Sequence, residues 1–80
     1  MKENKKLSHQ IAVIIEEDPI VGGFVISCPN LQGCYTQGKT IDEALKNIKE
    51  VIELCLRNLN PEEKKEALMP RDMTLGVVRV

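Results

Sequence analysis

The sequence predicts a small α+β fold with the order β-β-β-α-β. The first observation is a stripe of apolar residues at steps of three and four over residues 41–59, the spacing of one helix face. The second is a pair of apolar, β-branched runs separated by a turn-forming stretch, which is typical of a hairpin. We therefore expect one long amphipathic helix to pack on one face of a small mixed or antiparallel sheet.

The long helix is expected to begin after Thr40 and to reach Leu59. Glu43 follows Thr40 at the spacing of a capping box, in which the hydroxyl accepts a hydrogen bond from the amide of Glu43 and the carboxylate accepts one from the amide of Thr40. The expected core face comprises Ile41, Ala44, Leu45, Ile48, Val51, Ile52, Cys55, Leu56 and Leu59. The opposite face is charged, so it should be solvated.

Two strands are expected before this helix, at Ile11–Ile15 and Phe24–Cys28. The stretch Asp18–Gly23 between them contains proline and a glycine pair, which favour a turn, so the strands should form an antiparallel hairpin. The first strand is apolar on both faces, and one helix covers only one of them. We expect the other face to meet a partner or to remain an apolar surface patch.

Three further elements complete the expected chain. Cys34–Gln37 has the composition of a short third strand. Asn60 and Pro61 suit the cap and first residue of a short second helix. Met73–Val80 alternates as a fourth strand, and because it follows a helical crossover we expect it to lie parallel to an earlier strand, which gives a mixed sheet.

The length and composition predict one small domain over residues 1–80, with residues 1–6 as a polar, flexible tail. Phe24 and Tyr35 are the only aromatic residues, so the core must be aliphatic. Small domains with cores of this kind commonly gain stability by association. We therefore expect a homodimer or a higher homo-oligomer.

Charge and cysteine usage limit the environment and the partners. The formal net charge of −1 excludes the strongly basic character of an autonomous nucleic-acid binder. No stretch has the ~20 apolar residues of a membrane helix, and no secretory signal is visible. Three cysteines, an odd number, indicate reduced thiols and not a disulfide framework. The expected location is the cytoplasm, without membrane association.

The sequence contains no pattern of residues that predicts catalysis, a metal site or a cofactor. No carboxylate lies inside an apolar strand, where paired divalent ions of a nuclease would need it. His9 is the only histidine and has no evident orienting partner. Cys28 and Cys55 read as small hydrophobic residues, while Cys34, beside a glycine, is the thiol to test for reactivity. These negatives favour a binding module.

The residues from Gly23 to Leu56 resemble the HicB family of antitoxin-like proteins, and they read GFVISCPNLQGCYTQGKTIDEALKNIKEVIELCL. The shared elements are a glycine-aromatic-valine strand, a proline-x-leucine-x-glycine-cysteine connection, threonine-glutamine-glycine, and a threonine-capped helix that opens with an acidic pair and alanine-leucine. The resemblance implies a truncated ribonuclease H-like fold without catalytic residues. It also implies oligomerisation and binding to HicA, a small basic toxin that cleaves messenger RNA. Many members carry a C-terminal DNA-binding segment, which we do not expect here.

Taken together, we expect a non-enzymatic interaction domain that neutralises a HicA-like toxin by covering it. The candidate contact residues are Ile20 and Val21 in the hairpin turn, and Tyr35 and Gln37 on the third strand. One alternative is a stand-alone oligomeric regulator of another partner, in which an oligomer-generated surface binds nucleic acid. The other is a degenerate metal-dependent nuclease using Glu16, Asp18 and a helix carboxylate with magnesium.

Overall fold

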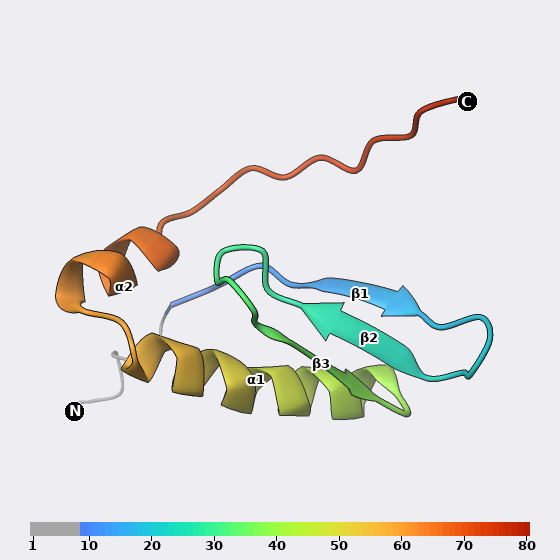
Figure 1. The fold of residues 1–80 in the computed structure, drawn as a ribbon, viewed down its shortest axis with the longest axis horizontal. Helices are drawn as coiled ribbons and strands as arrows, with labels where there is room; N and C mark the ends of the chain where they lie inside the picture. The colour runs from blue at the N-terminus through green and yellow to red at the C-terminus, as the bar shows by residue number, and fades with distance from the viewer. Residues whose placement is uncertain (1–8) are drawn as a thin grey trace.

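The computed structural model describes residues 9–80, so the expected tail over residues 1–6 lies outside the described residues. Its elements, in chain order, are β1 (Ile14–Glu17), β2 (Phe24–Ser27), β3 (Tyr35–Gly38), α1 (Ile41–Arg57) and α2 (Pro61–Ala67). The strands form one antiparallel sheet in the order β1-β2-β3, and α1 packs against it over β2 and β3 (Figure 1). The α+β class and the antiparallel hairpin are thereby confirmed.

The register of the sheet decides which side chains meet α1. Ile26, at the centre of β2, lies opposite Ile15 on β1 and Thr36 on β3. Because side chains alternate along a strand, the neighbouring row is on the other face, with Val25 between Glu16 and Gln37. Ile26 is fully buried, so the row that contains it is the one beneath α1.

The core is small and mostly aliphatic, as expected. It joins the sheet, the β2–β3 connection and both helices through Ile26, Cys28, Leu31, Cys34, Ala44, Ile48, Ile52 and Ala67. Phe24 is only half-buried at its edge. Two residues of the expected helix stripe, Ile41 and Leu45, are exposed, because the buried face of α1 is narrower than its apolar stripe.

The N-terminal cap and the last residue of α1 differ slightly from those expected from the sequence. The Thr40 hydroxyl accepts a hydrogen bond from the amide of Glu43 at 3.1 Å, as expected. The Glu43 carboxylate accepts from the amide of Lys39, one residue before the expected Thr40. The helix ends at Arg57, and Leu59 packs against the core from beyond its end.

The first strand begins three residues later than expected and includes Glu16 and Glu17. Ile14 lies opposite Ser27, the last residue of β2. The chain after Ser27 turns away, with the amide of Leu31 donating to the carbonyl of Cys28 at 3.1 Å, so residues before Ile14 have no strand to pair with. Residues 11 and 13 still pack on the core through their side chains.

The expected fourth strand does not form within the described chain. Residues 73–80, here called the C-terminal arm, lie outside every strand and helix, and the sheet is antiparallel rather than mixed. In Figure 1 the arm and α1 lie on opposite sides of the sheet, and the arm runs away from the body. The expectation of a fourth strand over residues 73–80 is therefore wrong, because no strand among residues 9–80 pairs with this segment.

The short second helix is confirmed, from Pro61 to Ala67. Asn60 caps it through a complete capping box with Glu63, at 2.8 Å and 3.0 Å. Among the described residues, neither helix has the length and apolarity needed to cross a membrane.

Gly38 allows α1 to approach β3 closely, and this contact is testable. A Cβ atom at Gly38 would lie 2.4 Å from the backbone nitrogen of Ala44 and 2.8 Å from its Cα atom. We expect Gly38→Ala to lower the free energy of unfolding by about 1–3 kcal/mol or more, because backbone would have to move. Urea denaturation followed by circular dichroism measures this change.

Gly76→Ala in the C-terminal arm is the matched control, since nothing lies within 4 Å of the added methyl group. It should change the free energy of unfolding by less than about 0.5 kcal/mol. Equal stability of the Gly38→Ala variant and the wild type would contradict the close approach.

Candidate interaction surface

The sheet has an outer face, opposite α1, that carries three accessible apolar or aromatic side chains. The register places Ile14, Glu16, Val25, Ser27, Tyr35 and Gln37 on it. Ile14, Val25 and Tyr35 keep 46%, 37% and 68% of their surface exposed. The second face of the sheet is therefore neither fully apolar nor fully polar. Apolar side chains from all three strands share it with polar ones.

The turn between β1 and β2 is held in shape by one aspartate. The Asp18 carboxylate accepts hydrogen bonds from the amides of Ile20 and Val21, at 3.0 Å and 3.1 Å. These bonds, from Val21 first and then Ile20, lower the pKa of the Asp18 carboxyl. Gly22 and Gly23 follow with φ of 88° and 80°, a conformation that glycine adopts without strain. The turn thus presents both apolar side chains to solvent.

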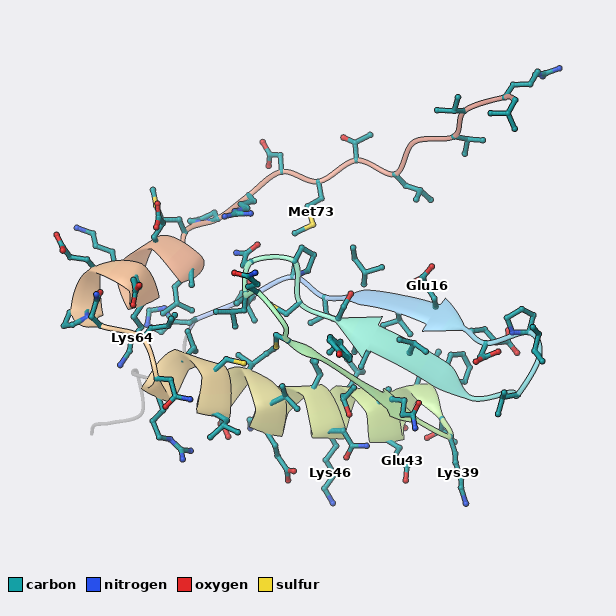
Figure 2. All side chains as sticks on the ribbon, in the orientation of Figure 1. Glu16, Lys39, Glu43, Lys46, Lys64 and Met73 are labelled. Atoms are coloured by element: carbon teal, nitrogen blue, oxygen red, sulfur yellow. The ribbon has the colours of Figure 1, made fainter. Side chains whose placement is uncertain are left out.

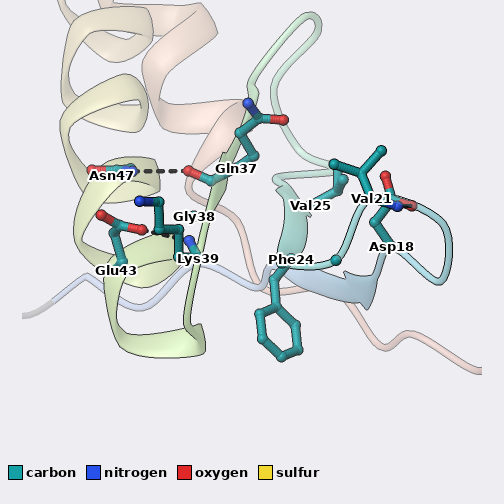
Figure 3. Close-up of a pocket in the computed structure, with 11 residues that line it drawn as sticks. Asp18, Val21, Phe24, Val25, Gln37, Gly38, Lys39, Glu43 and Asn47 are labelled. Carbon is teal, nitrogen blue, oxygen red and sulfur yellow. Dashed lines mark hydrogen bonds between the residues drawn. The ribbon is translucent and has the colours of Figure 1, made fainter.

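An open concavity lies where this turn meets the end of β3 (Figure 3). Val21 and Gln37, two of the four expected contact residues, line it together. Ile20, in the same turn, and Tyr35, farther along β3, do not line the concavity. The remaining labelled side chains around it are Asp18, Phe24, Val25, Lys39, Glu43 and Asn47, with Gly38 contributing backbone. The mixed lining suits a polar protein contact better than an apolar ligand.

Asn47 has a role that the sequence reasoning missed. It lies on α1 outside the apolar stripe, where a solvated side chain is expected, yet its side-chain amide donates to the backbone carbonyl of Gln37 at 2.8 Å (Figure 3). This bond occupies a carbonyl on the outer edge of β3 and ties that edge to α1. Asparagine is a poor helix former, and its presence inside the helix is the one signal in the sequence that pointed to a local partner.

The three cysteines are close together, and Cys34 is not a reactive thiol. Cys28 and Cys34 are each only 2% exposed, and the amide of Cys28 donates to the carbonyl of Cys34 at 2.9 Å. Burial, together with the neighbouring thiols of Cys55 and Cys28, raises the pKa of Cys34 to about 12. A thiol that stays protonated is a poor nucleophile. The hypothesis of reactivity at Cys34 is therefore wrong.

The residues of the nuclease alternative do not converge. Glu16 points away from the sheet on its outer face, and Asp18 is engaged with the turn amides (Figure 2). Over residues 9–80, no group of three or more histidine, cysteine, aspartate or glutamate side chains is placed to hold a metal ion.

Comparison with known proteins identifies relatives across most of the chain. The family model described as a HicB-like antitoxin of a bacterial toxin-antitoxin system matches residues 11–75. One UPF0150 protein of Synechocystis is 48% identical over 54 residues, which cover 68% of this chain and 77% of the relative. Another from the same organism is 35% identical over 80 residues, which cover 96% of this chain and the whole relative.

A relative from another organism is also similar to this chain. A UPF0150 protein of Thermoplasma acidophilum is 39% identical over 66 residues, which cover 82% of this chain and 87% of the relative. No solved structure matches the chain.

The raised pKa of Cys34 gives a prediction for alkylation at pH 8. Iodoacetamide should modify Cys34 about 10³-fold more slowly in the folded chain than in the unfolded chain, where a cysteine pKa is about 8.5. Mass spectrometry of peptides after timed quenching measures the two rates. Modification in 6 M guanidinium is the control, and equal rates in the two states would contradict the assignment.

The same shift predicts how stability depends on alkaline pH. The unfolded chain loses the Cys34 proton near pH 8.5, while the folded chain keeps it until about pH 12. The buried, protonated Cys34 thiol contributes fully to the free energy of unfolding below the pKa of the unfolded chain. This contribution is lost as the pH rises from about 8.5 to about 12. The free energy of unfolding should therefore fall from pH 8.5 upward, and Cys34→Ala should reduce that fall.

Proposed function

The chain belongs to the HicB-like antitoxin family, and from this premise we propose that it is a non-enzymatic antitoxin that binds a HicA-type, mRNA-cleaving toxin in the cytoplasm. The observation that carries the proposal is the family match over residues 11–75, which spans the sheet and both helices. Inhibition by such a protein is steric, because a toxin whose active face is covered no longer admits RNA. It requires a contact surface and no catalytic group.

The outer sheet face and the adjoining turn are the proposed contact surface for the toxin. Tyr35 supplies a large, accessible aromatic side chain of the kind that is enriched at protein interfaces. Gln37 lies on the same face and also lines the concavity with Val21. Ile20, in the same turn, extends the apolar contact. A stable complex buries about 800 Å² on each partner. A toxin bound in this way would cover both the outer sheet face and the adjoining turn.

We also propose that the chain associates with itself. β1 is accessible along its whole length, and several apolar side chains elsewhere remain exposed. A core of this size gains stability when such surface is buried between copies.

Co-expression with a HicA-type toxin encoded beside the chain's gene tests the proposal. We expect the wild-type chain to restore growth and to prevent mRNA cleavage by purified toxin. Tyr35→Asp should weaken toxin binding by about tenfold or more, as loss of an aromatic anchor does. Isothermal titration calorimetry measures the affinity.

Leu54→Asp is the matched control, because Leu54 is 55% exposed on α1, away from the outer sheet face. It should bind the toxin as the wild type does, and circular dichroism should show both variants folded. Failure of the wild-type chain to bind or to protect against the toxin would overturn the function. If both variants bound the toxin equally weakly, the contact surface would not be the outer sheet face.

A further inference from the structure

The C-terminal arm is an apolar, extended segment that pairs with no strand among the described residues of its own chain. Leu75, Val77 and Val78 are 95%, 92% and 83% exposed. The Cα radius of gyration is 14.6 Å, whereas a compact chain of this length has about 12 Å. Such exposure of large aliphatic side chains along one segment is characteristic of surface that another chain buries.

The point where the arm leaves the body is fixed by contacts. The side-chain amide of Asn30 donates to the carbonyls of Ala67 and Met69, at 2.9 Å and 3.5 Å. Pro70 then restricts the backbone. Met73 is still partly covered, and its side chain points back toward the body from the root of the arm (Figure 2). From there on the arm leaves the body (Figure 1), so the position of its root is set while its apolar residues remain unpaired.

β1 offers the complementary feature, an open strand edge. The amide of Asp18 donates to the carbonyl of Gly23, which makes these residues a hydrogen-bonded pair. Bonded and non-bonded pairs alternate in an antiparallel ladder, so Glu16 and Ile14 also face β2 with their backbone groups. The N–H and C=O groups of Ile15 and Glu17 must then point away from β2, toward solvent.

The two edges of the sheet differ in how well they are covered. On β3, the carbonyl of Gln37 is already occupied by the Asn47 side chain, and α1 packs over the strand. α1 does not extend in the same way over β1, all of whose residues are exposed, including Ile14 and Ile15. An added strand would pair with the open edge and cover apolar side chains beside it.

The charges near the C-terminal arm and those along β1 are opposite in sign. β1 and the turn after it carry Glu16, Glu17 and Asp18 in succession. The arm and its root carry Arg71 and Arg79, one near each end, with a single acidic residue between them. One of the two arginines would lie toward the acidic end of β1 whether the added arm ran parallel or antiparallel to it. Salt should weaken the association accordingly.

We propose that the C-terminal arm of one copy adds as an edge strand to β1 of a second copy, and that the two copies exchange arms reciprocally. Each chain carries one arm and one open edge, so a two-fold arrangement satisfies both arms and both edges and closes the assembly. The exchange supplies the missing fourth strand from a second chain. It deepens the self-association proposed above and requires no toxin, so it stands or fails separately from toxin binding.

Light scattering coupled to size-exclusion chromatography of the full chain, without toxin, tests the exchange. The wild type should elute as a dimer at 100 µM, and Val77→Asp should be a monomer, since a carboxylate would enter the interface beside acidic β1. Leu54→Asp is the matched control: it introduces a carboxylate at a residue that is 55% exposed on α1, on the side of the sheet opposite the arm, and it should remain dimeric. A monomeric wild type, or a dimeric Val77→Asp, would overturn the proposal.

Amide hydrogen exchange identifies the pairing partner. The amides of Ile15 and Glu17 should exchange at least tenfold more slowly in the wild-type dimer than in Val77→Asp, and dilution to monomer should remove this protection. Protection that persists in a monomer would mean that the arm folds onto its own β1. Unprotected amides in a dimer would place the interface elsewhere. Either result refutes the reciprocal exchange.

Discussion

The close contact between α1 and β3 is the constraint on which the rest of the structure depends. Gly38 ends the third strand directly against the backbone of Ala44, and Ala44 is itself fully buried. Two small residues at this crossing bring the helix axis down onto the sheet, so that Ile48 and Ile52 reach Ile26 and the β2–β3 connection. The Asn47 bond to the Gln37 carbonyl holds the same crossing from the side. A domain with so few buried side chains depends on each of these contacts.

Because the helix lies over β3 and β2, the opposite edge strand of the sheet, β1, is left uncovered. A single helix covers a limited width, so β1 remains exposed on its free edge and over its side chains. The C-terminal arm is an apolar segment whose large side chains stay exposed and which pairs with no strand among the described residues. The exposure of β1 follows from the position of the helix, which is centred over β3 and β2. The proposed exchange of arms joins these two unsatisfied parts between copies.

This arrangement separates two kinds of contact on one small sheet. The outer face with Tyr35, and the turn held by Asp18, are available to a partner protein. The free edge of β1 is a distinct surface, made of backbone groups and acidic side chains. A protein that acts by covering another protein needs the first surface. Self-association through the second would leave the first accessible and would place two copies of it on one assembly.

The sequence by itself determined the elements whose cause is local. Periodicity and capping fixed α1 and α2, and turn chemistry fixed the β1–β2 hairpin, because these depend on residues a few positions apart. The motif from Gly23 to Leu56 also indicated the family, although the contact residues on the surface stay a prediction. Only the tertiary structure decided the rest. The start of β1 depends on where β2 ends, and the low reactivity of Cys34 depends on burial among distant residues. Alternation over residues 73–80 predicted a fourth strand, but a strand needs a neighbouring edge, and no strand among the described residues pairs with the arm.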